Sequence, residues 1–271
     1  MNKKSLLRLL IITLSAIVLL IAIFGILMPE ERYAPNFSQK NLAPSMEHPF
    51  GTDNLGRDMF YRTIKGLSNS ILIGVIASVL SAFLALILGV LSATLGGWID
   101  TLVTWLIDLC MGLPHTILLI LISLMLGKGL RGIFIGVALT HWPSLTRIIR
   151  AEVMQIRSSQ YIQVSRQFGK STFFISRNHI IPHVCPQLLV GLIQLFPHAI
   201  LHEASITFLG FGLPLDMPAI GVILSEAMKY LSLGRWWLTI FPGATLLIVV
   251  LMIDAIGETL RTLLYPVSAQ E

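Results

Sequence analysis

Apolar residues run in long blocks along this chain, and shorter polar segments separate the blocks. A hydrocarbon layer about 30 Å thick is crossed by roughly 20 apolar residues in a helix. The blocks are continuous rather than alternating, which favours helices over the strands of a barrel. We therefore expect an all-α membrane protein with six transmembrane helices, at about residues 9–28, 67–95, 101–126, 133–149, 184–211 and 236–253.

The composition supports this prediction and adds an orientation. Of the 271 residues, 55% are hydrophobic and 12% are charged, whereas a soluble domain carries about 25% charged residues. Basic residues gather at the N-terminus and between residues 147 and 177, where Glu152 is the only acid. Because basic residues concentrate beside the cytoplasmic ends of spans, both termini and this segment are expected inside. The net charge of +5 then reflects topology and does not indicate nucleic-acid binding.

Three connections between the predicted spans are long. Residues 29–66 and 212–235 are expected outside, and residues 151–183 inside. Loops of this length are usually functional or fold on their own. We divide the chain into an N-terminal anchor helix with its external segment, residues 1–66, and a transmembrane domain, residues 67–264, that contains the inside loop.

The inside loop predicts a helical hairpin. Residues 161–168 form one helix, Gly169 ends it, and residues 172–180 form a second helix that Pro182 closes before the next span. Two interpretations stay open at this point. The hairpin is either a docking surface for a partner or a connector that packs against the bundle.

One motif in this loop suggests nucleotide binding and fails. The letters GKST, at residues 169–172, match the end of a phosphate-binding loop. That loop needs another glycine five positions before its second glycine, and Val164 stands there. We expect no nucleotide site in this chain, so the energy for any active transport must come from another subunit.

Four segments together resemble the inner-membrane permease subunits of ABC importers, in the peptide/nickel branch, and in particular its C-type subunits. The resemblance covers nearly the whole chain. The segments are FGTDNLGRDMFYR (Phe50–Arg62), the inside loop with Gly169 and HIIP (His179–Pro182), HEASITFLGFGLP (His202–Pro214) and FPGATLLIVVLMIDAIGETLR (Phe241–Arg261).

Some positions depart from the family pattern. Gln163, Val164 and Ser165 stand where the family's coupling loop often has Glu-Ala-Ala. Ile220 replaces a common tryptophan, and Tyr265 replaces a common aspartate. These departures concern the loop contacts and leave the overall resemblance intact.

The resemblance implies a type I ABC importer permease fold with cytoplasmic coupling helices, in the inner membrane of a bacterium. The chain would work with a homologous permease, two ATP-binding subunits and an extracytoplasmic substrate-binding protein, surrounded by membrane lipid. ATP and Mg²⁺ would bind the partner subunits, while this chain would hold no cofactor and would not be an enzyme. The residues implied in ATPase coupling are Gln163, Val164, Ser165, Gly169, Lys170, His179 and Pro182.

The fifth predicted span carries His198, His202 and Glu203 in an otherwise apolar run. The two histidines share a helix face, while Glu203 points about 100° away from His202. All three therefore cannot meet one small ion. Either Glu203 accepts hydrogen bonds from a neighbouring helix beside neutral histidines, or the histidine pair contacts a transition metal in transit. Further ligands would then come from a chelator or from the partner permease.

The His-x-x-x-His pair looks closer to nickel-transporting members of the family than to peptide-transporting ones. Nickel or another transition-metal complex is therefore the first expectation for the cargo, and di- or oligopeptides are the alternative. On the third span, Asp108 and His115 are seven residues apart and share a face, which predicts a buried pair beside a bend at Pro114.

Two other classes of protein fit less well. An intramembrane metalloprotease needs His-Glu-x-x-His, and Ile206 occupies the final position. A self-contained secondary transporter needs ion-coupling carboxylates and commonly shows inverted repeats. Asp108 and Glu203 are too few for that mechanism, and no internal repeat is visible.

Overall fold

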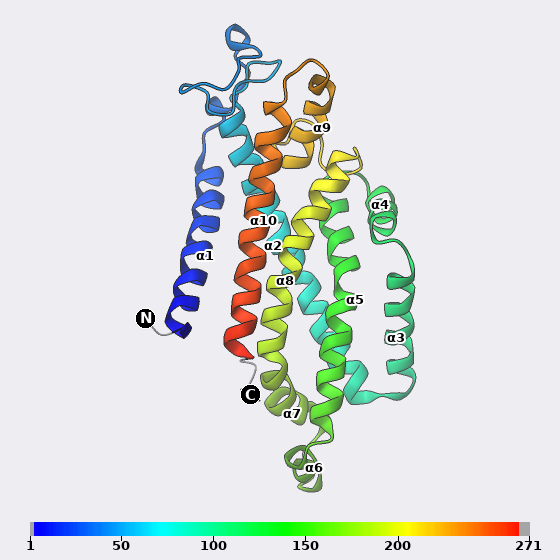
Figure 1. Ribbon diagram of the computed structural model, residues 1–271. Helices are drawn as coiled ribbons and strands as arrows, with labels where there is room; N and C mark the ends of the chain where they lie inside the picture. The colour runs from blue at the N-terminus through cyan, green and yellow to red at the C-terminus, as the bar shows by residue number, and fades with distance from the viewer. Residues whose placement is uncertain (1–2, 266–271) are drawn as a thin grey trace.

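The structure, a computed structural model, describes residues 3–265, which are helical apart from loops and one isolated bridge between Thr52 and Asp58 (Figure 1). The elements are α1 (Lys3–Leu27), η1 (Glu30–Arg32), η2 (Phe37–Gln39), α2 (Met59–Leu95), α3 (Gly97–Gly112), α4 (His115–Met125), α5 (Leu130–Arg157), α6 (Gln160–Gln167), α7 (Thr172–Ile175), the π-helical turn η3 (Ser176–Ile180), α8 (Ile181–Phe208), α9 (Ile220–Leu231) and α10 (Trp237–Leu264).

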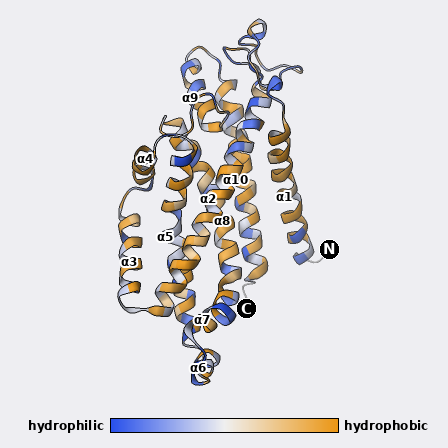
Figure 2. Cartoon of the chain, turned by 180° about the vertical axis from the view of Figure 1, so that it is seen from behind, coloured by the Kyte–Doolittle hydropathy of each residue, from blue (hydrophilic) through white to orange (hydrophobic). Residues whose placement is uncertain are grey.

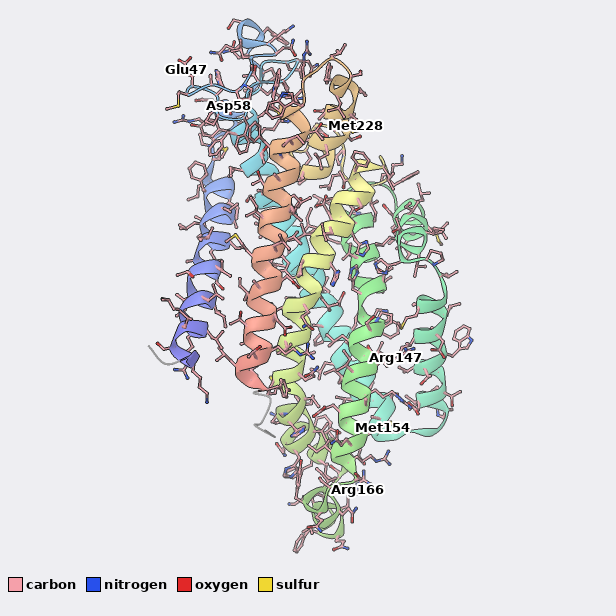
Figure 3. All side chains as sticks on the ribbon, in the orientation of Figure 1. Glu47, Asp58, Arg147, Met154, Arg166 and Met228 are labelled. Atoms are coloured by element: carbon pink, nitrogen blue, oxygen red, sulfur yellow. The ribbon has the colours of Figure 1, made fainter. Side chains whose placement is uncertain are left out.

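The long helices form one bundle with two distinct ends. We call the end that carries α6 and α7 the hairpin end, and the end that carries residues 29–58 and α9 the loop end (Figure 1). Apolar residues cover the length of the helices, while hydrophilic residues gather at both ends (Figure 2). Glu47 and Asp58 mark the loop end, and Arg166 marks the hairpin end (Figure 3). This distribution is that of a bundle embedded in lipid.

The membrane-crossing helices agree only in part with the predicted six. Within residues 3–265, four helices are long and apolar enough to cross, namely α1, α2, the continuous run Thr172–Phe208 and α10. The pair α3 and α4 supplies a fifth crossing if it counts as one broken span. Helix α5 packs along α2 inside the bundle, but polar residues lower its hydropathy. Length and composition thus support four or five spans rather than six.

The third predicted span is broken at Pro114. Helices α3 and α4 meet at an angle of 102°, because Leu113 and Pro114 are extended and a residue before proline avoids the helical region. The predicted bend is confirmed, but the predicted pair of Asp108 and His115 is wrong, since the two lie on different helix axes. Asp108 instead pairs with Arg147 across 3.2 Å, and both side chains are exposed.

The predicted hairpin at residues 161–180 is present, but its second arm does not end at Pro182. Gly169, with φ of +72°, separates α6 from α7. Helix α7 then continues through η3 into α8 without a break. In the π turn, the Ile181 N–H donates to the Ser176 carbonyl, and this wider turn accommodates Pro182, which has no N–H to donate. The second arm of the hairpin and the membrane span are therefore one helix.

Candidate functional site

The loop-end segment owes its shape to the Phe50–Arg62 motif. Asp53 Oδ1 accepts hydrogen bonds from the N–H groups of Leu55 and Arg57, each at 2.9 Å, which closes a tight turn. Gly56 has φ of +74°, and a Cβ there would lie 1.7 Å from the Asn36 carbonyl oxygen. The motif residues thus build a local fold before they contact anything else.

The same motif starts α2. Asp58 is the N-cap residue, and its Oδ1 accepts the Phe60 N–H at 2.9 Å, which satisfies one of the free donors of the first turn. Its other oxygen lies 2.7 Å from Nδ1 of His48. The Phe50 ring stacks on Phe241 with 4.7 Å between centroids, so the segment is also attached to α10.

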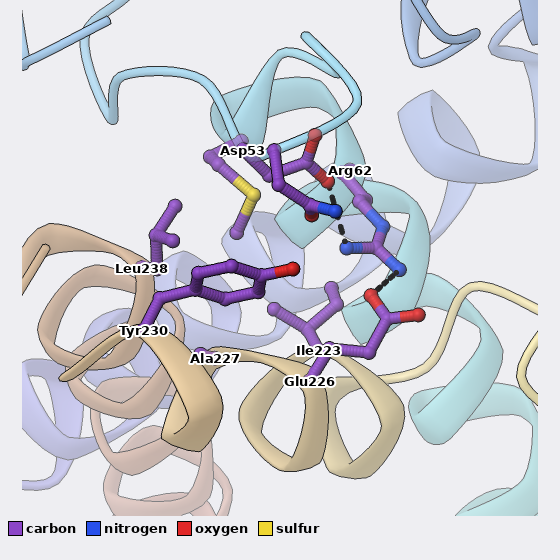
Figure 4. A pocket seen from close by; sticks show the side chains of 9 residues that line it. Asp53, Arg62, Ile223, Glu226, Ala227, Tyr230 and Leu238 are labelled. Atoms are coloured by element: carbon purple, nitrogen blue, oxygen red, sulfur yellow. Dashed lines mark hydrogen bonds and ion pairs between the residues drawn. The ribbon is translucent and has the colours of Figure 1, made fainter. Parts of the chain in front are cut away.

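Four charged side chains then connect α2 to α9, and Figure 4 shows three of them, Asp53, Arg62 and Glu226. Arg62 donates to Glu226 at 2.6 Å and to Asp53 at 3.3 Å. Arg57 donates to Asp53 at 2.6 Å and to Glu226 at 2.9 Å. The Arg62 side chain is 4% exposed and that of Asp53 is 5% exposed. Sequence reasoning missed Glu226, because it lies far along the chain from the motif that it completes.

Replacing Arg62 by methionine is expected to lower the free energy of unfolding by about 2–3 kcal/mol. Removing one partner of a buried ion pair leaves the other charge uncompensated, at a cost of about 3–5 kcal/mol when both are fully buried, and Glu226 is partly exposed. The matched control is Arg261→Met, because Arg261 and Glu258 form an exposed pair worth about 0–1 kcal/mol. Thermal unfolding in detergent measures both variants. Equal midpoints would contradict the assigned role of the network.

The hairpin end is held by buried isoleucines. Ile162 of α6, Ile175 of α7 and Ile180 of η3 are each at most 2% exposed. They pack in one cluster with Val153 of α5 and Val184 of α8. Ile162 is the one buried residue of α6, so this short helix buries a single side chain in that cluster.

The residues predicted to couple to an ATPase lie in two groups. The first group lies at the tip of the hairpin, by which we mean α6 and the turn into α7. Its exposed members are Gln163, Val164, Gly169 and Lys170, and Ser165 is half-buried beside them. His179 is half-buried near the Tyr161 ring, and Pro182 is exposed on the first turn of α8. The tip also carries Phe168 and Phe173, which are 79% and 75% exposed. The coupling role of this set stays a prediction, and the two phenylalanines are additions from the structure.

Two arginines connect the base of the hairpin to the rest of the bundle. Arg150 of α5 binds both carboxylate oxygens of Asp100 at 2.6 and 2.7 Å, and Ser92 also donates to this carboxylate. Arg157 donates to the Ala93 carbonyl at 2.8 Å, near the end of α2. A bidentate pair fixes geometry as well as distance. Helices α2, α3 and α5 therefore form one braced unit above the hairpin.

Glu203 lies in the interior and faces away from the histidines. It is fully buried, and its Oε1 accepts from Thr207 Oγ1 at 3.0 Å. Thr207 in turn accepts the Leu213 N–H at 3.2 Å, which holds the chain after α8. One donor thus lies one turn along the same helix, and Ser70 of the neighbouring helix α2 lies beside the same carboxylate.

Three histidines from different helices meet in the bundle. His115 of α4, His141 of α5 and His202 of α8 each offer one ring nitrogen, and these nitrogens lie within 4.8 Å of one another. His198 is not part of this group but lines the same cavity, of about 340 Å³. The sequence singled out His198 and His202 as a pair, with further ligands from outside the chain. The structure instead brings His202 together with two histidines of the chain itself.

The fold and these features define a membrane transport permease, and comparisons with known proteins agree. The chain belongs to the family of binding-protein-dependent transport system inner membrane components, which it matches over residues 84–266. The expected resemblance to ABC importer permeases is thereby confirmed, and the family is one of transport permeases rather than enzymes.

Several curated relatives are peptide permeases. The chain is 32% identical to the dipeptide transport system permease protein DppC of Bacillus subtilis, over 89% of this chain and 75% of the relative. It is 34% identical to the oligopeptide permease OppC of the same organism, over 98% and 86%. It is 38% identical to a putative peptide permease of Brucella suis, over 82% and 75%. These names favour the peptide alternative over nickel, which the sequence had placed first.

A solved structure supports the fold. A chain of the methionine ABC transporter MetNI, in an inward-facing conformation, matches with a TM-score of 0.61 and 17% identity. The match covers 75% of this chain and 97% of that chain. At this identity the likeness shows the type I importer fold and does not bear on the cargo.

Proposed function

We propose that this chain forms half of the translocation path of an ATP-driven importer. The observation that carries the proposal is the continuity of the hairpin with the span, since residues 172–208 form one helix from the exposed tip to the loop end. A force applied at the tip reaches the interior through hydrogen-bonded helix rather than through a loop. The first arm of the hairpin is continuous in sequence with α5, whose Arg150 and Arg157 contact α3 and α2. Motion of the hairpin therefore also reaches these two helices.

The partners follow from this mechanism. Two ATP-binding subunits take up the hairpins of this chain and of a homologous permease, with which it forms a heterodimer. ATP and Mg²⁺ bind those subunits. A substrate-binding protein delivers cargo at the loop end, where residues 29–66 and 212–235 form its landing surface.

The orientation follows from the same arrangement. The Lys3 end of α1 and the Leu264 end of α10 lie at the hairpin end (Figure 1). If ATPases dock at that end, both termini are cytoplasmic and the loop end faces outward from a bacterial inner membrane. The basic residues of the 147–177 segment support this assignment, because such residues concentrate on the cytoplasmic side.

For the cargo, the names of the relatives favour short peptides. A transition-metal ion or a metal chelate is the second candidate, and the specific observation in its favour is the group of three histidines inside the bundle.

Reconstitution tests the function. The chain and its partner permease are placed in liposomes with and without the ATPase subunits, and ATP-driven uptake of a dipeptide and of a nickel chelate is measured from loaded binding protein. Uptake is expected only when both the ATPase subunits and ATP are present. Equal uptake in their absence would identify a self-contained transporter and contradict the proposal.

A further inference from the structure

Four of the seven histidines of this chain line one cavity in the bundle. His115, His141, His198 and His202 share it with neutral residues, among them Ser144 and Gln194, and no Asp, Glu, Lys or Arg lines it. The four histidines differ in exposure. His198 is exposed, His115 and His202 are half-buried, and His141 is buried. The cavity therefore leads from an open mouth at His198 to an enclosed inner end.

Hydrogen bonding fixes the state of His141. Its Nδ1 lies 2.9 Å from the Val137 carbonyl oxygen, and a carbonyl can only accept, so Nδ1 carries the proton. The other nitrogen, Nε2, then presents a lone pair. In the described part of the chain, Nε2 of His141 and Nε2 of His115 are buried without a hydrogen-bond partner. Buried polar atoms are nearly always paired, so these two nitrogens are available to a group that enters the cavity.

The chemistry of this group is that of a transition-metal site. Neutral imidazole nitrogens suit nickel, copper and zinc. A histidine that binds a metal usually donates its other N–H to a carbonyl or carboxylate, which orients the ring, and His141 already makes that bond. The rings are close, with centroids 4.6 Å apart for His115 and His141 and 4.3 Å apart for His115 and His202.

The distances indicate a site that is not fully closed. Nitrogens at about 2.0–2.1 Å from a tetrahedral ion lie about 3.4 Å from one another, whereas the three here lie within 4.8 Å. A closure of at most about 1.4 Å would complete the coordination. A site that closes and reopens with the helices is suited to brief contact, because a permanently tight site would retain its ion.

We propose that His115, His141 and His202 form a binding site for a divalent first-row transition-metal ion, with His198 at its mouth. The proposal deepens the second candidate cargo of the proposed function, since the ion would enter alone or as the centre of a chelate. Metal binding itself needs no ATPase, so the site can be tested apart from transport.

The test uses the full chain with its partner permease in detergent, purified through a tag without histidine. Co²⁺ is the probe, because its visible absorption reports nitrogen ligands and coordination number. The expected result is saturable binding of one equivalent with a new absorption band. His202→Asn and His141→Asn should weaken that binding at least about tenfold, because even the loss of a residue that only orients a ligand costs about 10- to 100-fold in metal affinity. His183→Asn, on an exposed histidine at the hairpin end, should leave it unchanged.

Folding is checked in the same samples. Co²⁺ should raise the thermal midpoint of the original chain and of His183→Asn, and should not raise that of His202→Asn, because only binding to the folded state stabilises it. Absence of the absorption band, or equal Co²⁺ binding by all variants, would overturn the site. ATP-driven dipeptide uptake that persists in that case would leave the proposed function standing.

Discussion

Replacing Gly169 by valine is expected to reduce ATP-driven uptake at least about tenfold while ATP hydrolysis by the partner subunits continues. Gly169 has φ of +72° and ends α6. A β-branched residue in this left-handed region costs of order 1–3 kcal/mol, and about 1.4 kcal/mol is a factor of ten in an equilibrium. The hairpin tip would therefore leave the geometry in which the ATPase takes it up.

The surroundings of Gly169 make this experiment specific. A Cβ at this position would meet no atom within 4 Å, so valine acts through the backbone alone. Asparagine tolerates the left-handed region, and Gly169→Asn should retain most uptake. Gly127→Val is the matched control, because Gly127 also has a positive φ, of +86°, and open space around it, but lies between α4 and α5. Uptake and cargo-stimulated ATP hydrolysis are measured for all three in liposomes.

Two results would contradict the coupling role. One is full uptake by Gly169→Val. The other is an equal loss in Gly169→Asn, because the effect could not then arise from the backbone angle.

Replacing Ile162 by alanine is expected to weaken binding of the ATPase subunits by roughly 10- to 100-fold. Truncating a buried isoleucine costs about 2–5 kcal/mol, and Ile162 is the one buried residue of α6. Isolated helices shorter than about 12 residues are marginal in water, so α6, with 8 residues, depends on this contact for its place.

The controls separate docking from general stability. Ile162→Leu keeps the volume and should cost less than about 1.5 kcal/mol. Ile17→Ala makes the same chemical change on an exposed residue of α1 and should leave ATPase binding unchanged. Binding is measured between the detergent-solubilised permease pair and the ATPase subunits, with thermal midpoints recorded in parallel. If Ile162→Ala binds the ATPase normally, then α6 is not positioned by this side chain.

The sequence predicts the parts of the fold that depend on one segment at a time. Apolar length located the helices α1, α2, α8 and α10, and the turn at Gly169 was predicted because a helix end commonly needs a left-handed residue. The same reasoning failed at Pro182. A proline usually closes a helix. The π turn that accommodates it here lies between Ile175 and Ile181, in a segment whose Ile175 and Ile180 pack in the buried cluster, and such long-range packing cannot be read from a local pattern.

The sites that join several segments could be predicted only in part. Helical spacing placed His198 and His202 on one face of α8, but it could not show that His115 and His141 face them. His115 reaches the cavity only because α4 turns by 102° after α3. Glu226 was missed for a similar reason, because the motif that contains Arg62 does not indicate that α9 packs against it.

The continuous helix from Thr172 to Phe208 has a geometric consequence. About 30 residues separate its exposed tip from His202, and at about 1.5 Å per residue they span about 45 Å. A rod of that length that pivots at its tip by about 2° displaces its far part by about 1.5 Å. That displacement is large enough for the closure of at most about 1.4 Å that would complete the coordination. A rotation of about 2° could therefore switch the three imidazoles between binding and releasing a metal ion. The affinity of this histidine site for the ion would then follow the nucleotide cycle of the ATPase subunits.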